Sequence, residues 1–154
     1  MLTPKGADIT ATITLTPYRR LSVNRAGFAL LHPLDGVVGT PMMVRHSDGV
    51  WVTSQFPTQI SPSQTAVDIT GLQHKIRSVD LGFIFIGEVF EMEDQRNWSD
   101  ASFKTYCRPL SAPKPFILMP GRQWCKQFGC KWGQMGRAHF AEIREKMLPR
   151  TFHR

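Results

Sequence analysis

The residues best suited to chemistry in this sequence are concentrated between residues 88 and 110, which read EVFEMEDQRNWSDASFKTYCRPL. Carboxylates that crowd one another disfavour each other's ionisation, so one of the four acids from Glu91 to Asp100 could act as a general base. The alternative is that these acids pair with neighbouring cations and fix a loop. Either role requires a rigid frame. The acids, cations and large rings of the stretch are Glu88, Glu91, Glu93, Asp94, Asp100, Arg96, Lys104, Arg108, Phe90, Trp98, Phe103 and Tyr106.

Nucleophilic catalysis through a serine has weak support in the sequence. No G-x-S-x-G motif is present, and Ser99 and Ser102 lie near acids without a histidine in the same stretch. A Ser-His-Asp arrangement would require folding to bring in His32, His46 or His74. The alternative is that these histidines have no catalytic role.

The segments around this stretch predict β structure. Residues 9–16 alternate apolar side chains with threonine, as in a half-buried strand, and residues 46–49 (HSDG) predict the turn of a hairpin between 42–45 and 50–53. Residues 83–92 are apolar on both faces and predict one central strand. It is followed by a charged connection at 94–100 and a partner strand at 101–108. Two more strands are expected at 27–32 and 66–70, with an irregular crossing at 56–64.

These patterns favour a mainly β fold, an antiparallel β-sandwich, because no helix-period segment of useful length precedes residue 121. The 154 residues have room for one domain. No apolar run could span a bilayer and the N-terminus lacks a signal-peptide pattern, so we expect a cytoplasmic protein without membrane contact. Three cysteines are an odd number and do not form a disulfide framework, which fits a reducing compartment. No cofactor is expected.

The basic charge of the chain belongs to its tail. Residues 1–120 hold 11 Lys+Arg against 10 Asp+Glu (+1), and residues 121–154 hold 8 against 2 (+6). Trp124, Phe128 and Trp132 recur every four residues as on a helix, although the nearby glycines disfavour one, and residues 137–148 predict a short C-terminal helix. Basic residues among aromatic rings could bind single-stranded nucleic acid, but we consider a nucleic-acid partner a minor alternative.

Two further readings of the tail remain. Cys125, Cys130 and His139 raise the question of a zinc site, but their spacing matches no standard closed site, and we expect no metal. The second reading is that residues 122–154 are translated out of frame. The shifted frame of residues 123–132 alternates apolar and polar positions as a strand does.

With these residues laid out, the chain resembles the D-apionate lactonase family, hydrolases of an aldonolactone in apiose catabolism. The resemblance rests on NRAGFALLHPLDGVVGTP (24–41), FPTQISPSQ (56–64) and above all VFEMEDQRNWSDASFKTY (89–106). It covers most of residues 9–121. It implies a β-sandwich ahead of a TIM-like barrel in a longer enzyme. The expected organisation is a partial sandwich at 1–121 and a basic tail at 122–154.

The resemblance implies that the chain is a lactonase fragment, converting D-apionolactone to D-apionate in the full-length enzyme and inactive alone because the barrel is missing. Its partners would be a sugar lactone or aldonate and the barrel. Arg96, Asn97 and Lys104 could bind a sugar's hydroxyls or carboxylate, and Trp98 could stack on a sugar ring or serve as a core or hinge aromatic. The candidate substrate-binding or domain-contact residues are Glu91, Glu93, Asp94, Arg96, Asn97, Trp98, Asp100 and Lys104. The alternative function is a stand-alone sugar-binding or protein-interaction sandwich.

Overall fold

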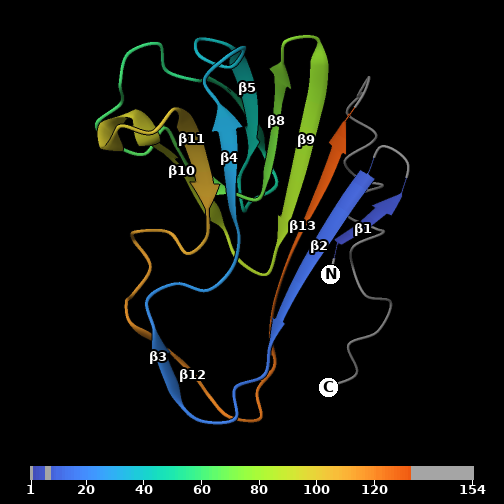
Figure 1. The fold of residues 1–154 in the computed structure, drawn as a ribbon, viewed down its shortest axis with the longest axis vertical. Helices are drawn as coiled ribbons and strands as arrows, with labels where there is room; N and C mark the ends of the chain where they lie inside the picture. The colour runs from blue at the N-terminus through green and yellow to red at the C-terminus, as the bar shows by residue number, and fades with distance from the viewer. Residues whose placement is uncertain (1, 6–7, 133–154) are drawn as a thin grey trace.

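The fold, seen in a computed structural model that describes residues 2–5 and 8–132, consists of two antiparallel sheets and a small ribbon (Figure 1). The seven-stranded sheet has the order β1 (Leu2–Lys5), β2 (Asp8–Leu15), β13 (Trp124–Trp132), β9 (Val79–Ile86), β8 (Gly71–Ile76), β5 (Pro41–Arg45), β6 (Trp51–Gln55). The four-stranded sheet has the order β4 (Ala29–Pro33), β11 (Ser102–Tyr106), β10 (Phe90–Asp94), β7 (Ala66–Ile69). The ribbon pairs β12 (Phe116–Leu118) with β3 (Leu21–Val23).

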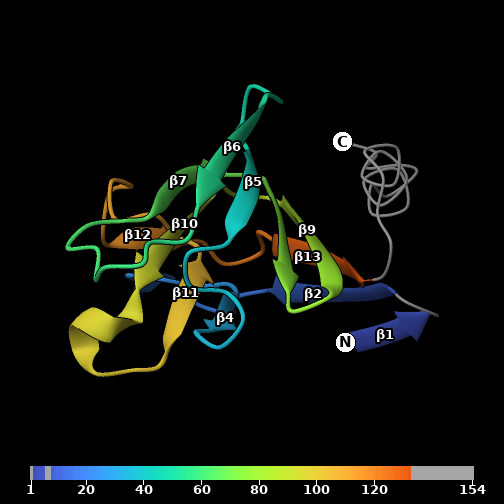
Figure 2. The same cartoon turned by 90° about the horizontal axis from the view of Figure 1, so that it is seen from above.

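The core lies between the two sheets, whose strands are seen from above in Figure 2. Strands of both sheets contribute apolar side chains to one cluster. The rings of Phe85 on β9 and Phe90 on β10 stack across this space with centroids 4.1 Å apart. The predicted mainly β, antiparallel fold is therefore confirmed. The buried cluster consists of Val37, Met42, Val44, Phe56, Ile69, Leu72, Phe83, Phe85, Phe90, Met92, Phe103 and Cys107.

Most predicted strands are present near their predicted bounds. The Asp-Gly turn joins β5 to β6, and their register pairs Val44 with Val52. Residues 56–64 cross irregularly from β6 to β7, as expected from their prolines. β10 pairs with β11, and between them the 3-10 helix η1 (Gln95–Trp98) occupies the charged connection.

The prediction of one central strand over residues 83–92 is wrong. The chain turns at Gly87, whose φ is +99°, and passes from β9 in the larger sheet to β10 in the smaller one. Phe83 and Phe85 point into the core from β9, whereas Phe90 and Met92 do so from β10. The core-facing positions thus change from odd to even across the turn. Ile84, on the opposite face of β9, is buried as well, so two successive strands together produced a run that is apolar on both faces.

The predicted boundary at residue 121 falls shortly before β13, which lies inside the seven-stranded sheet between β2 and β9. In the printed reading frame, Phe128 of this strand packs edge-on against Phe28 with ring centroids 4.9 Å apart. The out-of-frame hypothesis stays a prediction that the nucleotide sequence can test.

The helix predicted at 137–148 and His139 lie outside the described residues. Across the described residues no helix is long and apolar enough to cross a bilayer.

Candidate functional site

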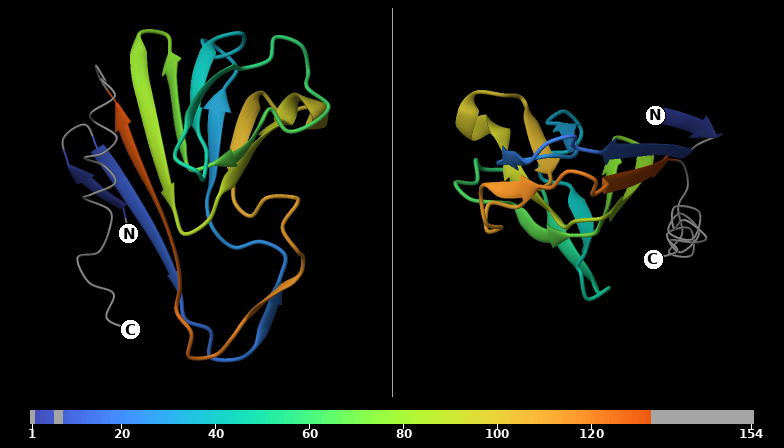
Figure 3. Two further views of the ribbon diagram at one scale, coloured as in Figure 1. Left: turned by 180° about the vertical axis from the view of Figure 1, so that it is seen from behind. Right: turned by 90° about the horizontal axis from the view of Figure 1, so that it is seen from below.

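The charged connection, residues 94–100, lies with the irregular crossing at one end of the four-stranded sheet, on the side of the molecule away from β1 (Figure 3). Asp94 is the last residue of β10 and the N-cap of η1, where its carboxylate accepts a hydrogen bond from the backbone N–H of Arg96. Ser99 ends η1 in the left-handed region with φ +63°. The connection is therefore a capped helical turn rather than an irregular loop.

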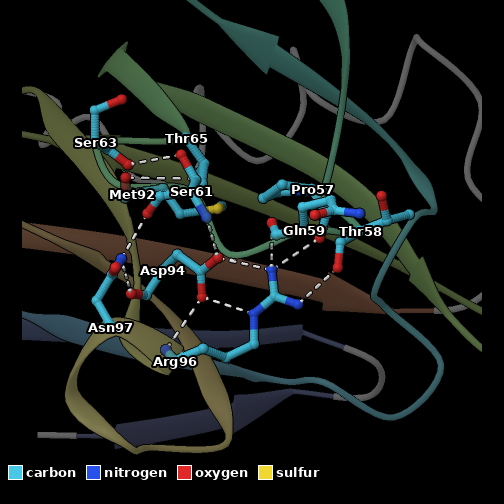
Figure 4. A network of polar contacts seen from close by, with 10 residues as sticks. All are labelled: Pro57, Thr58, Gln59, Ser61, Ser63, Thr65, Met92, Asp94, Arg96 and Asn97. Atoms are coloured by element: carbon cyan, nitrogen blue, oxygen red, sulfur yellow. Dashed lines mark hydrogen bonds and ion pairs between the residues drawn. The ribbon is translucent and has the colours of Figure 1, made fainter.

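Asp94 and Arg96 form a polar staple that ties the connection to the irregular crossing (Figure 4). The Asp94 side chain is fully buried and also accepts from the Ser61 backbone N–H at 2.9 Å and from the Arg96 guanidinium at 2.7 and 2.9 Å. Burial opposes ionisation of Asp94, but the hydrogen bonds from Arg96 and Ser61 prevail and hold its pKa below the ordinary value. The carboxylate is thus kept charged inside the structure.

The Arg96 guanidinium continues the staple into the crossing. It donates to the carbonyl oxygens of Pro57, Thr58 and Gln59, each at 3.0 Å, and lies over the Phe103 ring at 5.2 Å from the centroid. Asn97 adds hydrogen bonds from its side-chain amide to the carbonyls of Ser61 and Asp94. The carbonyls of four residues of this crossing are therefore satisfied by side chains of the connection, namely those of Pro57, Thr58, Gln59 and Ser61.

The solvent side of the connection carries a second group built around Glu93. Lys104, opposite Glu93 in the β10–β11 register, places Nζ 3.1 Å from a Glu93 carboxylate oxygen. Gln95 donates to the same carboxylate at 2.9 Å, and the Trp98 indole Nε1 donates to it at 3.3 Å. Partial burial disfavours the charge, yet the bonds from Lys104, Trp98 and Gln95 lower the pKa of Glu93. The Trp98 ring itself is 71% exposed.

Two predicted site residues lie apart from this group. Glu91 is buried on β10, where its carboxylate accepts from the Tyr106 hydroxyl and from the Leu110 backbone N–H. Burial and the Glu91 contact raise the pKa of Tyr106, so the phenol stays protonated. Asp100 is exposed and accepts from the Ser102 hydroxyl at 3.3 Å. Structure therefore joins Glu93, Asp94, Arg96, Asn97, Trp98 and Lys104, but not Glu91 or Asp100.

Two of the four acids, Asp94 and Glu93, pair with cations as the loop-fixing alternative expected, whereas Glu91 and Asp100 do not. Arg96 pairs with Asp94, Lys104 with Glu93, and Arg108 with Glu88 at 3.0 Å. Lys126 of β13 lies 3.1 Å from the other Glu88 oxygen, a partner that the sequence did not indicate. Within the described residues no group of three or more potential ligands could hold a metal ion.

The histidines do not assemble a serine triad in the part of the chain that the structure describes. His32 and His74 lie in the core and contact each other. His46 lies beside Asp68, but the Ser47 hydroxyl donates at 2.8 Å directly to the Asp68 carboxylate, and His46 Nδ1 is 3.2 Å from the Asp68 backbone oxygen. A hydroxyl activated for attack would need the imidazole as its acceptor, so this cluster has the wrong order.

Sequence reasoning missed the contribution of the irregular crossing to the site. Ser61 supplies a backbone N–H to Asp94, and Pro62, Ser63 and Gln64 line a pocket of about 270 Å³ together with Glu93, Asn97 and Trp98. The segment FPTQISPSQ was visible as a motif, but nothing in its own residues indicated that it folds against a segment more than thirty positions later. The pairing of β10 with β7 and the hydrogen bonds of the staple bring the two together.

These features define an antiparallel β-sandwich domain in which one end of the smaller sheet carries a stapled polar surface. Residues 2–134 match the family described as the D-apionate lactonase N-terminal domain, and the chain belongs to that family. A D-apionate lactonase of Brucella anthropi is 42% identical over 114 residues, which are 73% of this chain and 19% of that protein. The chain therefore spans about a fifth of the length of this curated relative. No solved structure matches.

Proposed function

We propose that this chain acts as the sandwich domain of a carbohydrate lactone hydrolase that converts D-apionolactone to D-apionate. Its charged connection would form a wall of the substrate pocket or the contact surface onto a catalytic barrel. The observation that carries this proposal is the Asp94–Arg96 staple, which fixes the connection rigidly while Asn97 and Trp98 remain exposed. A surface of fixed polar groups is what a substrate wall or a domain contact requires.

The chain alone would not hydrolyse the lactone. Ring opening requires a nucleophile or activated water and donors for the developing oxyanion. The Ser47–Asp68–His46 cluster has the wrong hydrogen-bond order, and Asp94 already accepts from Ser61 and Arg96. The matched part of the relative is also only 19% of its length, which leaves room for catalytic groups elsewhere. We therefore place the chemistry outside this domain.

A chimera tests this proposal. Residues 2–134 of this chain would replace the N-terminal domain of the Brucella anthropi lactonase, and lactone hydrolysis would be followed by acid release. The double variant Asp94→Asn, Arg96→Met releases the connection, so we expect kcat/KM to fall at least about tenfold, the loss typical of a misplaced substrate-positioning element.

The control for the chimera is Lys126→Met, which removes an ion pair of similar burial at β13, away from the connection. It should lower the melting temperature without a comparable loss of kcat/KM. Unchanged kinetics in the double variant would remove the proposal. Binding of an aldonolactone by the 154-residue chain without any turnover in the chimera would favour the alternative, a stand-alone sugar-binding sandwich.

A further inference from the structure

A small pocket on the solvent side of the connection, here named the Trp98 pocket, has the composition of a carbohydrate subsite. It has a volume of about 270 Å³ and is lined by Pro62, Ser63, Gln64, Glu93, Asn97 and Trp98. Its two sides come from the irregular crossing and from β10 with η1, the segments that the Asp94–Arg96 staple joins. The pocket is therefore built on a fixed frame rather than on two independent loops.

The Trp98 ring is both exposed and oriented. Its 71% exposure leaves a large apolar surface in water, which is unfavourable unless a partner covers it. Its indole N–H donates to Glu93, and Glu93 is held in turn by Lys104 and Gln95. This chain of contacts restricts rotation of the ring, so a ligand that stacks on it would lose little binding energy to ordering the side chain.

Polar groups with unused hydrogen-bonding capacity surround the ring. Among the described residues, the Ser63 hydroxyl and the Gln64 amide make no hydrogen bond, whereas Asn97 uses its amide nitrogen and leaves its oxygen as an acceptor. Together they offer donors and acceptors beside an apolar face. The charge of Glu93 is matched by Lys104, so the pocket offers no excess charge to an ionic ligand.

We infer that the Trp98 pocket binds the ring of a neutral polyhydroxylated molecule, a sugar or its lactone, with the C–H face of the ring on the indole and its hydroxyls toward Gln64, Ser63 and Asn97. This inference rests on the proposed function, which supplies a lactone substrate, and it names the residues that contact the ring. The open-chain aldonate binds more weakly, because it lacks a rigid ring to cover Trp98 and the pocket offers its carboxylate no unpaired cation.

The experiment titrates the full 154-residue chain with D-ribono-1,4-lactone and, separately, with sodium D-ribonate. Binding is followed by the NMR signals of the four tryptophan indole N–H groups. For a ligand of this size we expect a dissociation constant on the order of millimolar. The Trp98 signal should shift with the lactone, with at least a severalfold weaker effect from the aldonate.

Substitutions assign the site. Trp98→Ala should weaken lactone binding by about tenfold or more, and Trp98→Phe should retain part of it, because a ring remains to stack. Gln64→Ala should weaken binding severalfold. The matched control is Tyr18→Ala, which removes another exposed ring, 87% exposed and outside the pocket, and it should leave the affinity unchanged.

Two results would overturn the inference: a Trp98 signal that does not move up to about 50 mM lactone, far above the expected millimolar range, or unchanged affinity in Trp98→Ala. If the chain fails to bind but the chimera loses turnover when Asp94 and Arg96 are replaced, the subsite is wrong and the proposed function stands. If the lactone binds at Trp98 but the chimera is insensitive to that replacement, the subsite stands and the proposed function fails.

Discussion

Two histidines form a hydrogen-bonded chain across the core, and their partners fix the tautomer of each ring. The Lys75 carbonyl can only accept, so His74 donates to it from Nδ1 at 3.2 Å. His74 Nε2 must then accept from His32 Nδ1 at 3.1 Å, which leaves His32 Nε2 to accept from the Thr105 hydroxyl at 2.9 Å. These directions hold while His74 is neutral, the form that its burial favours, and every ring nitrogen of the chain is then satisfied.

Acid should therefore destabilise the protein through these histidines. Burial and the neighbouring His74 lower the pKa of His32 to about 3, and burial also lowers that of His74. The unfolded chain takes up a proton at each ring near pH 6.5 and the folded chain does not, so their contribution to stability is complete above pH 6.5 and is lost as pH falls toward 3. His32 alone should cost about 2 kcal/mol between pH 6.5 and 4.5.

Urea unfolding at pH 7.0 and 4.5 measures this loss, and ¹⁵N spectra of the imidazoles check its assignment. At pH 7 both rings should show a protonated Nδ1 and an unprotonated Nε2, and His32 should keep this neutral form at pH 5. A His32 ring that titrates near pH 6.5 would contradict the hydrogen-bonded chain.

The sequence indicated which side chains form the charged connection and its ion pairs better than it indicated the backbone groups that bind them. The acids lie within about a dozen residues of cations, which indicated local pairing, and the structure pairs Asp94 with Arg96 and Glu93 with Lys104. The Ser61 N–H and the carbonyls that Arg96 binds lie more than thirty positions earlier. Backbone groups carry no side-chain signature, so no pattern of residue types could reveal that they complete the site.

Among the elements, short strands with alternating apolar and polar residues and a turn signal between them were predictable from the sequence. A strand whose apolar spacing fits both a helix and a strand was not. In β13 the rings of Trp124, Phe128 and Trp132 recur at intervals of four. Residues four apart share a face in a strand as well as in a helix. The spacing therefore could not decide between them, and the pairing of β13 with both β2 and β9 does so.

The turn from β9 to β10 gives a prediction at this scale. Gly87 has φ +99°, and a Cβ added there would lie 2.7 Å from the Cys125 backbone oxygen of β13. Gly87→Ala should cost about 3 kcal/mol or more, because backbone strain adds to a clash that side-chain movement cannot relieve. Gly121→Ala is the control, since Gly121 also has a positive φ of +72° but meets nothing within 4 Å.

In Gly121→Ala only the strain of a left-handed residue should lower the stability, by about 1 kcal/mol. Urea unfolding of both variants against the parent chain measures the two costs. Equal costs for Gly87→Ala and Gly121→Ala would mean that contact with β13 does not restrict the turn between the sheets.

For the whole molecule, β13 determines whether the larger sheet is continuous. It is hydrogen-bonded to β2 over eight register pairs and to β9 over six. Without it, β1 and β2 would have no connection to the rest of that sheet, and β9 would expose an unpaired edge. Lys126, the third residue of this strand, also forms the ion pair with Glu88. The basic charge that composition assigns to a tail therefore partly belongs to the sheet.

Two truncations test this role of β13. A chain of residues 1–121 lacks the strand, so β2 is no longer joined to β9 and part of the core loses its cover. This chain should therefore show no cooperative unfolding transition. A chain of residues 1–134 keeps every described strand and the full extent of the family match, so it should unfold cooperatively with a melting temperature within about 3 °C of the 154-residue chain. Circular dichroism during heating measures both. Cooperative unfolding of the 1–121 chain at the parental temperature would show that β13 adds length to the sheet without holding it together.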